Sequence, residues 1–257
     1  MNPLTLDRFA VSPCSNPELG LDEALREYAK IGFRKFEGFT SWAKSALDWH
    51  KAPEEYLAKA RAHGFEFVSL HLPPINDDRE ASLREAVQAA RFARDLGAKV
   101  VLFKAASRPH YIAAAKPFLD AVAGLGVTPV LQNHFGTPIT TLDDFREVVE
   151  GIGDPRMKTL LEVGQFHSAG VRWRDGWELL RESVALVHIK DQVDNRPVPF
   201  GEGEIDLAGL FRHMAAVGYT GDYVVEMEAA RGDTERTLQL LRDARAYLER
   251  TLEEVNR

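Results

Sequence analysis

The sequence predicts one (β/α)8 barrel, a single domain that spans residues 1–257. Eight short apolar runs recur along the chain, helical patterns lie between them, and strand and helix alternate throughout. Such alternation specifies a parallel sheet, and eight units in a chain of this length favour closure into a barrel. An open, doubly wound sheet is the alternative. It usually carries a glycine-rich phosphate turn after the first strand, where this chain has SPCSNPEL.

The expected strands are nearly continuous runs of apolar residues, as parallel strands covered on both faces should be. They lie at residues 9–14, 35–39, 67–72, 99–104, 128–134, 158–164, 185–191 and 221–228.

The helical patterns carry signals at their ends. In the first, Asp22 is expected to cap the helix and Gly32 to end it. Thr141 and Asp144 predict a reciprocal capping box, with aspartate standing in for the usual glutamate. Asp206 is expected to cap a later helix. The helices are expected at residues 21–32, 79–97, 141–150, 206–217 and 233–253.

Composition and charge exclude several classes of function. The net charge is −7, with acids and bases mixed along the chain, which argues against a nucleic-acid partner. No run approaches the roughly 18 apolar residues of a membrane span. The single cysteine, Cys14, fits a reducing compartment, and the N-terminal residues do not resemble a signal peptide. We therefore expect a cytoplasmic protein.

Polar side chains stand at the end of nearly every expected strand. In a barrel of this kind, function sits at the C-terminal ends of the strands. Burial of so many polar groups costs free energy unless they are paired, so the pattern indicates a functional site. The residues are Cys14, Glu37, His71, Lys104, Gln132, His134, Glu162, His188, Lys190, Glu226 and Glu228.

Four of these side chains form a candidate metal site. Gln132, Glu162, His188 and Glu226 end four successive apolar runs, so they should converge at one mouth of the barrel. Oxygen and imidazole donors without a thiolate suit Mn²⁺ or Mg²⁺, and also Co²⁺ or Zn²⁺. We therefore expect one divalent metal ion.

Five motifs resemble the xylose isomerase-like TIM-barrel family of sugar isomerases and epimerases. They are LQNHFG, LEVGQ, LVHIKD, PFGEGEID and VVEME. The resemblance covers nearly the whole chain. It implies one divalent metal ion at the four matching positions named above, a carbohydrate substrate and a possible homo-oligomer. The chain departs from the family pattern at three positions, because Gln132 replaces a glutamate, Glu162 an aspartate, and Gln165 a substrate-facing histidine.

The glutamine at position 132 narrows the expected chemistry. Its amide oxygen can ligate a metal ion but cannot accept a proton as a base. In the family's epimerases two metal-binding glutamates act on opposite faces of the substrate carbon, so the change argues against a two-base epimerase. Proton abstraction next to a carbonyl by Glu226 remains. It would give isomerisation of a sugar, keto-sugar or related polyol through an enediol, or β-elimination by a lyase.

Further roles follow for the other polar residues at the strand ends. His71 and His134 are expected to be catalytic, by supplying the acid or holding substrate oxygens. The expected substrate-binding residues are Glu37, Lys104, Gln165 and Lys190.

Other interpretations stay open. Gln132 could be a core amide in a non-catalytic carbohydrate-binding barrel. A phosphodiesterase with a multi-metal cluster would need more histidine and carboxylate ligands. The glycines of GEGEID could free backbone N–H groups for an anion, but Glu202 and Glu204 would repel one, so a non-phosphorylated substrate is expected.

Overall fold

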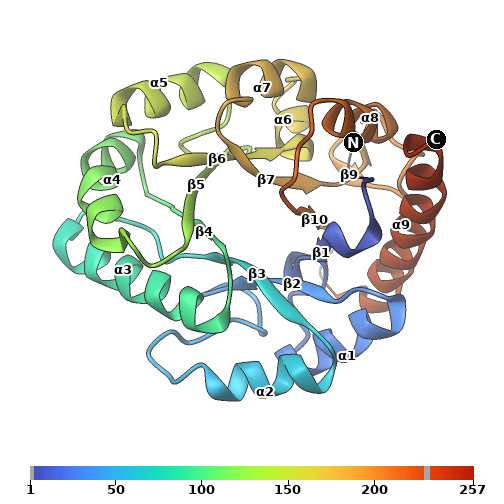
Figure 1. Ribbon diagram of the computed structural model, residues 1–257, viewed down its shortest axis with the longest axis horizontal. Coiled ribbons are helices and arrows are strands. Elements are labelled where there is room, and N and C mark those ends of the chain that lie inside the picture. Colours follow the sequence, from blue (N-terminus) through green and yellow to red (C-terminus); the bar gives the residue numbers. More distant parts are fainter. Residues whose placement is uncertain (1–2, 229–231) are drawn as a thin grey trace.

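The computed structural model describes residues 3–228 and 232–257. Eight parallel strands close into a barrel in the order β1-β10-β7-β6-β5-β4-β3-β2, which confirms the predicted fold (Figure 1). The strands are β1 (Phe9–Val11), β2 (Lys35–Phe39), β3 (Glu66–His71), β4 (Val100–Leu102), β5 (Thr128–Gln132), β6 (Lys158–Glu162), β7 (Val184–Ile189) and β10 (Tyr223–Val225).

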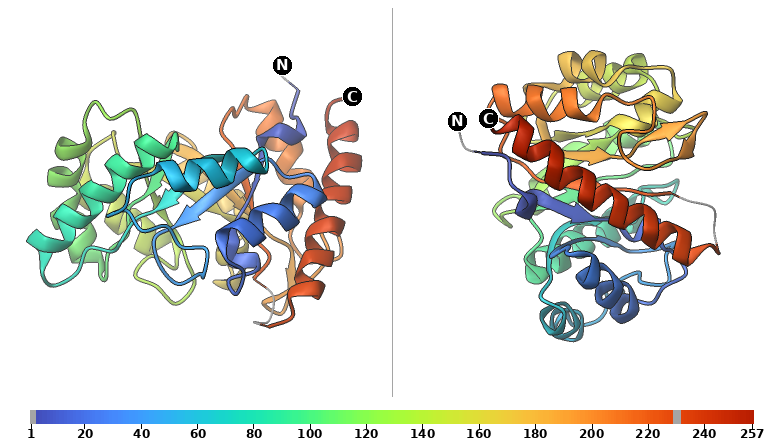
Figure 2. Two further views of the ribbon diagram at one scale, coloured as in Figure 1. Left: turned by 90° about the horizontal axis from the view of Figure 1, so that it is seen from below. Right: turned by 90° about the vertical axis from the view of Figure 1, so that its right-hand side faces the viewer.

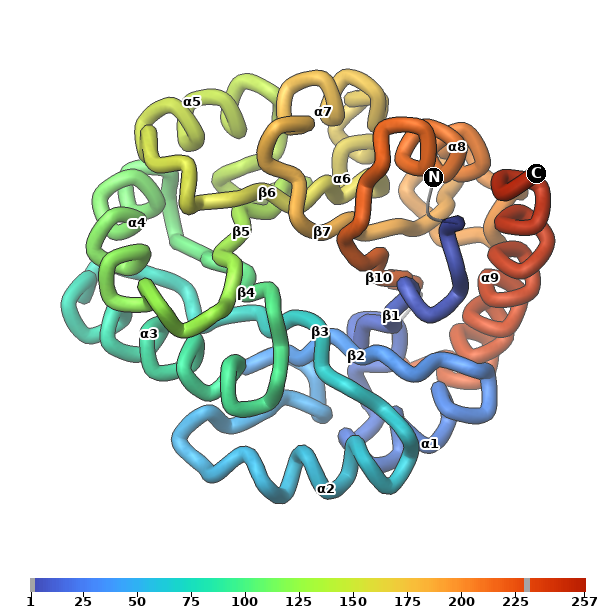
Figure 3. The backbone as a smooth tube through the Cα atoms, viewed as in Figure 1, coloured from blue at the N-terminus to red at the C-terminus, as the bar shows by residue number. Residues whose placement is uncertain are grey.

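Helices surround the strands as an outer layer, so the backbone forms one ring inside another (Figure 3). They are α1 (Leu21–Ile31), α2 (Glu54–Ala62), α3 (Arg79–Leu96), α4 (Arg108–Val122), α5 (Leu142–Ile152), α6 (Val163–Ser168), α7 (Trp173–Leu180), α8 (Leu207–Ala216) and α9 (Thr234–Val255). Two short 3₁₀ helices, η1 (Leu6–Arg8) and η2 (Pro13–Ser15), flank β1, and a hairpin of β8 (Gln192–Val193) and β9 (Arg196–Pro197) follows β7.

The two ends of the described chain lie side by side (Figure 2). The amide side chain of Asn256 accepts a hydrogen bond from the Leu4 backbone N–H and donates one to the Leu4 carbonyl, each at 2.9 Å. This pair joins the segment before β1 to the end of α9.

The main hydrophobic core fills the layer between the strands and the helices, and a second, smaller cluster fills the inside of the barrel. The inner cluster takes one small aliphatic residue from each of seven strands, and it forms a floor beneath the C-terminal mouth. Its members are Ala10, Val68, Leu102, Val130, Leu160, Leu186 and Val224.

The predicted strands agree with the observed ones in place; the strand at 35–39 matches β2, and the other seven predicted strands end late. Residues 133–134, for example, leave the sheet after Gln132 and enter the loop that follows β5. Some of the polar side chains, such as Lys104, His134 and Glu226, lie beyond the strand ends, whereas Gln132, Glu162 and His188 belong to the strands themselves.

The predicted helix ends hold in most cases. Gly32 ends α1 with a left-handed φ of 105°, and Asp206 caps α8 by accepting from the Gly209 N–H. The cap predicted at Asp22 was wrong. Gly20 is the N-cap of α1, and Asp22 lies within the first turn, where its carboxylate contacts His63 Nε2 at 2.9 Å.

Some helices carried no clear sequence signal. Helix α4 contains Pro117 in its interior, which interrupts the usual helical pattern. Helix α2 has Ala60 as its one buried residue, so its apolar face is narrow. No helix in the described ranges is both long and apolar enough to cross a membrane.

The capping box at the start of α5 is complete. Thr141 Oγ1 accepts from the Asp144 N–H at 3.2 Å, and Asp144 Oδ2 accepts from the Thr141 N–H at 2.9 Å. This pairing satisfies two backbone donors that the helix itself leaves without partners.

We expect Thr141→Ala to lower the free energy of unfolding by about 1 kcal/mol, because one of these donors loses its acceptor. Urea denaturation measures the change. Thr141→Ser, which keeps the hydroxyl, should stay close to the wild type. Equal stability of all three proteins would contradict the stabilising role of the box.

Candidate metal centre and substrate cavity

Besides β1, which has Ser12 there, five strands each place a polar side chain two residues beyond their floor residue. Because side chains alternate along a strand, a residue two positions past the floor points into the same barrel interior, one layer nearer the mouth. These five are Lys104, Gln132, Glu162, His188 and Glu226. The strand-end residues expected from the sequence therefore do converge.

His188 stands at the centre of this layer and is fully buried. Its Nε2 lies 3.1 Å from Glu37 Oε2, and the same carboxylate oxygen accepts a hydrogen bond of 2.8 Å from the Ser69 hydroxyl. Glu37 is itself 0% exposed. In the neutral ring with its proton on Nε2, directed at Glu37, the lone pair of Nδ1 points to the other side.

On that other side, Nδ1 of His188 faces two carboxylates. Glu162 Oε2 lies 3.1 Å from it and Glu226 Oε1 lies 3.3 Å from it. These contacts are within ion-pair distance, but neither His188 Nδ1 nor Glu162 Oε2, both buried, makes a hydrogen bond of good geometry with a described residue. Buried polar atoms without partners are rare in native proteins, and a missing ion is one of the usual reasons.

The orientation of Glu162 is set by the helix that follows it. Its Oε1 accepts from the backbone N–H groups of Gly164 and Gln165 at the start of α6, so Glu162 acts as the N-cap. Asn133 holds the Glu162 backbone with two further hydrogen bonds. The other oxygen, Oε2, is therefore held toward His188, as a metal ligand would need to be.

A related set of buried groups also meets here. Glu37, His71, His188 and Glu226 each offer one ligand atom, and these atoms lie within 4.8 Å of one another. The group is consistent with a divalent-metal site. His188 and Glu226 belong both to this set and to the set expected from the sequence, whereas Glu37 and His71 replace Gln132 and Glu162.

The charges in this layer shift one another's pKa values. Burial would lower the pKa of His188, but the carboxylates of Glu37 and Glu226 outweigh it and raise that pKa well above its ordinary value. Burial would raise the pKa of Glu226, but His188 and Lys190 hold it well below its usual range. Burial dominates at Glu162, whose pKa is raised. Each carboxylate thus depends on a neighbouring positive charge to stay ionised.

His71 has a different environment. Its Nε2 lies 3.0 Å from Glu37 Oε1, and its ring packs edge-on against Phe39 at 4.0 Å between centroids. Burial, with a contribution from the positive charge of Lys104, lowers the pKa of His71 to about 4. The ring is therefore neutral near pH 7.

Lys190 and Gln165 are directed at carboxylates. Lys190 Nζ lies 2.6 Å from Glu228 Oε2 and 3.5 Å from Glu226 Oε2. Gln165 Nε2 donates to the same Glu228 oxygen at 3.1 Å. A Cβ on Gly164 would lie 2.1 Å from Lys190 Cγ, so the glycine leaves the space that the lysine stem fills. Lys190, expected to bind substrate, is thus placed as a counter-charge for these glutamates.

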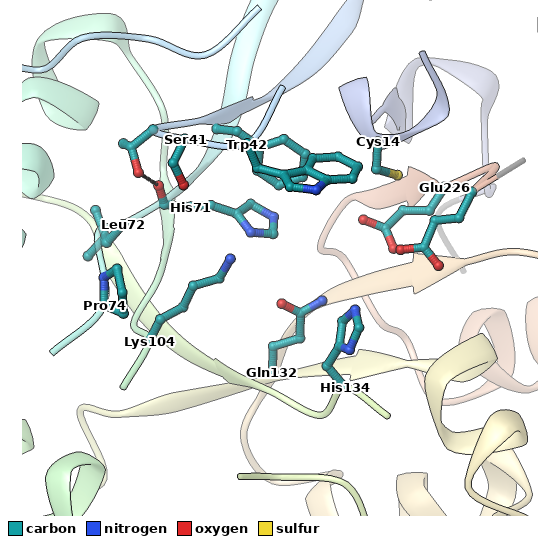
Figure 4. Close-up of a pocket in the computed structure, with 13 residues that line it drawn as sticks. Cys14, Ser41, Trp42, His71, Leu72, Pro74, Lys104, Gln132, His134 and Glu226 are labelled. Carbon is teal, nitrogen blue, oxygen red and sulfur yellow. Dashed lines mark hydrogen bonds between the residues drawn. The ribbon is translucent and has the colours of Figure 1, made fainter. Parts of the chain in front are cut away.

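A cavity of about 310 Å³ opens above this layer (Figure 4). Among the residues predicted to form the site, five line it: His71, Lys104, Gln132, His134 and Glu226. Glu37, Glu162 and His188 are fully buried, so the candidate metal layer meets the cavity through Gln132 and Glu226. The remaining lining residues are Cys14, Phe39, Thr40, Ser41, Leu72, Pro74, Trp42 and Glu228.

Trp42 is a lining residue that sequence reasoning missed. It has a positive φ of 73°, which is unusual for an aromatic residue, and its side chain is 57% exposed over the cavity. The indole lies edge-on to Phe39. The sequence signal was weak, since Trp42 lies in a loop without a motif.

Asp191 is a second residue that the sequence did not single out. Its Oδ1 accepts from the N–H groups of Gln192 and Ile205, and its Oδ2 accepts from those of Gly201 and Gly203. The glycine-rich loop therefore directs its donors at a buried carboxylate of the protein. The alternative in which they would bind a substrate anion is not supported.

We expect Asp191→Asn to lower the free energy of unfolding by roughly 2 to 4 kcal/mol, because a side-chain amide would face backbone donors that need an acceptor. Urea denaturation measures the loss, and amide hydrogen exchange should quicken at residues 201–205. Asp194→Asn, an exposed neighbour, serves as the control. Equal effects of the two variants would contradict the clamping role of Asp191.

The amino-acid sequence matches a family model described as "Xylose isomerase-like TIM barrel" over residues 25–250. The chain belongs to this family. The match covers most of the barrel, including all four strand ends that carry the candidate metal ligands.

Among curated proteins, the chain is 22% identical over 238 residues to a putative L-ribulose-5-phosphate 3-epimerase of Escherichia coli (strain K12), covering 82% of each chain. It is 25% identical over 269 residues to a putative hydroxypyruvate isomerase of Mus musculus, covering 88% of this chain and 90% of the relative.

Two solved structures have the same fold. A D-tagatose 3-epimerase-like protein superposes with a TM-score of 0.77 at 16% identity, over 96% of this chain and 98% of that chain. A probable 3-DHS dehydratase from Bacillus anthracis gives 0.76 at 15% identity, over 94% and 98%. The proteins that this chain resembles are thus described as sugar epimerases, an isomerase and a dehydratase.

Proposed function

We propose that this chain is a divalent-metal-dependent enzyme that abstracts a proton next to the carbonyl of a sugar, keto-sugar or related polyol. Isomerisation is the leading reaction, and Glu226 is the base. The observation that carries the proposal is the pair of buried atoms, His188 Nδ1 and Glu162 Oε2, which lie 3.1 Å apart without a well-formed hydrogen bond and face Glu226 at the cavity wall.

These atoms support Gln132, Glu162, His188 and Glu226 as the ligands. Nδ1 of His188 faces the carboxylates of Glu162 and Glu226, while Nε2 is taken by its contact with Glu37. Glu37 is therefore the residue that orients the imidazole rather than one that touches substrate. Gln132 completes the set from the cavity side. A bound divalent cation would polarise the substrate carbonyl and stabilise the negative charge that develops on its oxygen.

Glu226 combines two properties that a base needs. It lines the cavity, so a substrate can reach it, and its pKa is held low, so it is ionised near neutral pH. Lys190, held by Glu228, supplies the nearby positive charge that keeps it so. His134 and the neutral ring of His71 line the same cavity and can donate to or accept from substrate oxygens.

Elimination is the second candidate reaction. Gln132 cannot take up a proton, so a reaction that needs a carboxylate base on both faces of the carbon is disfavoured. Loss of a β-hydroxyl needs one base and an acid, which the cavity offers. The similarity to a probable dehydratase is compatible with this alternative.

A non-catalytic carbohydrate-binding barrel is a third and weaker candidate. Cytoplasmic location and homo-oligomer formation stay predictions.

We predict about one Mn²⁺, Mg²⁺, Co²⁺ or Zn²⁺ ion per chain in the purified protein. Elemental mass spectrometry before and after chelation measures it. Glu162→Ala should abolish stoichiometric binding, since it removes a charged ligand, and His71→Ala should retain it. Glu202→Ala, which removes an exposed carboxylate, is the control. Binding that survives in Glu162→Ala and is lost in His71→Ala would instead assign the ion to the set with Glu37.

Glu226→Gln should lower proton abstraction by about 10²–10⁴-fold, because the amide cannot accept a proton. Deuterium incorporation next to the carbonyl of D-tagatose, L-ribulose or hydroxypyruvate in D₂O, followed by NMR, gives the rate. Glu202→Gln removes an exposed carboxylate outside the cavity and should keep the exchange. Exchange at the wild-type rate in Glu226→Gln would show that another group is the base.

A further inference from the structure

The cavity contains an ammonium group whose charge no described residue pairs. Lys104 Nζ forms no hydrogen bond or ion pair with residues 3–228 or 232–257, and it lies 5.9 Å from the centroid of the Phe39 ring. Lys190, by contrast, meets Glu228 at 2.6 Å. An unpaired, partly buried charge costs free energy, so the site is built to meet a counter-charge from outside the protein.

The electrostatic surroundings of Lys104 fit this description. Burial lowers the pKa of Lys104, although the carboxylates of Glu37 and Glu226 act in the opposite direction. Among the described residues that line the cavity, Lys104 is the one lysine or arginine, so it is the basic side chain at its end of the cavity.

Lys104 and Glu226 lie on opposite sides of the barrel. In the closed strand order, three strands separate β4 from β10 in either direction. Lys104 follows the floor residue Leu102 by two positions, as Glu226 follows Val224, so the two side chains reach the same level. Figure 4 shows them entering the cavity from opposite sides. The cavity thus has a cationic side and, opposite it, the side with the proposed base and metal layer.

We propose that the substrate carries a carboxylate that binds Lys104, while its carbonyl end lies toward Glu226. The substrate class is then a sugar acid or keto acid rather than a neutral keto-sugar. This inference rests on the proposed function, because that function places the carbonyl beside Glu226.

A carboxylate fits better than a phosphate. Proteins usually surround a phosphate with several backbone N–H groups as well as cations. In the described residues, the glycine-rich loop that could offer such donors directs them at Asp191 instead. A cavity of about 310 Å³ is at the small end for ligand pockets, which suits a compact acid.

A matched pair of small probes tests the proposal without requiring turnover. Hydroxypyruvate and dihydroxyacetone share a hydroxyketone and differ in a carboxylate against a hydroxymethyl group. Calorimetric titration of the full chain in Mg²⁺ buffer should give at least about tenfold tighter binding of hydroxypyruvate. Lys104→Met should remove that preference, and Lys104→Arg, which keeps the positive charge, should retain most of it.

Lys99→Met is the control variant, because Lys99 is an exposed lysine just before the same strand and outside the cavity. Its preference should equal that of the wild type. If Lys104→Arg keeps the preference for hydroxypyruvate, position 104 tolerates substitution. Loss of the preference in Lys104→Met then reflects the lost charge rather than misfolding.

Three results would overturn the inference. One is a preference that persists in Lys104→Met, which would mean that the carboxylate is held elsewhere, for example by the metal ion. Another is equal or undetectable binding of both probes by the wild type. The third is tighter binding of dihydroxyacetone phosphate than of hydroxypyruvate, which would make the group a phosphate. All three results are binding measurements, so they can be distinguished from a failure of the proposed proton abstraction by Glu226.

Discussion

The whole upper layer of the barrel depends on the burial of His188 between carboxylates. Glu37 holds one ring nitrogen at 3.1 Å, and Glu162 and Glu226 face the other at 3.1 and 3.3 Å. Charged groups this deep are costly unless each meets an opposite charge, so every residue around them is constrained. The histidine, the carboxylates and the buried Lys190 can be understood only as one electrostatic unit.

Other features follow from that unit. Glu162 is fixed by capping α6, and Gly164 leaves room for the Lys190 stem beside it. An aspartate would be shorter by one methylene, and the longer glutamate reaches the helix N-terminus with one oxygen and His188 with the other. In the proposed ligand set, Gln132 would contribute an oxygen without a charge, so the layer would hold fewer negative charges to balance Lys190 and a bound cation.

Much of this could be predicted from the sequence because it is periodic or local. The alternation of strand and helix predicted the barrel. The alternation of side chains along each strand predicted that Gln132, Glu162, His188 and Glu226 lie at one level of it. The capping box of Thr141 and Asp144 could be predicted because it is local: both partners lie within one helical turn.

The remaining features depend on contacts between distant parts of the chain. Glu37 and His188 are 151 positions apart, and nothing near Glu37 in sequence indicates that it orients an imidazole. Asp191 belongs to the LVHIKD motif, but the motif does not show that its carboxylate oxygens accept hydrogen bonds from the glycine-rich loop. From the sequence alone, the N–H groups of that loop could equally bind an anion. The exposed indole of Trp42 depends on a positive φ that its residue type does not suggest.

The central claim is that His188 is the histidine that binds the metal, through the nitrogen that faces Glu162 and Glu226. Electron–nuclear double resonance on the Mn²⁺-loaded protein, with ¹⁵N-labelled histidine, tests it most directly. The account predicts coupling to the nitrogen of a single histidine, lost in His188→Gln and unchanged in His71→Gln. Coupling to two histidine nitrogens, or loss of coupling in His71→Gln, would contradict it and place the ion between Glu37 and His71.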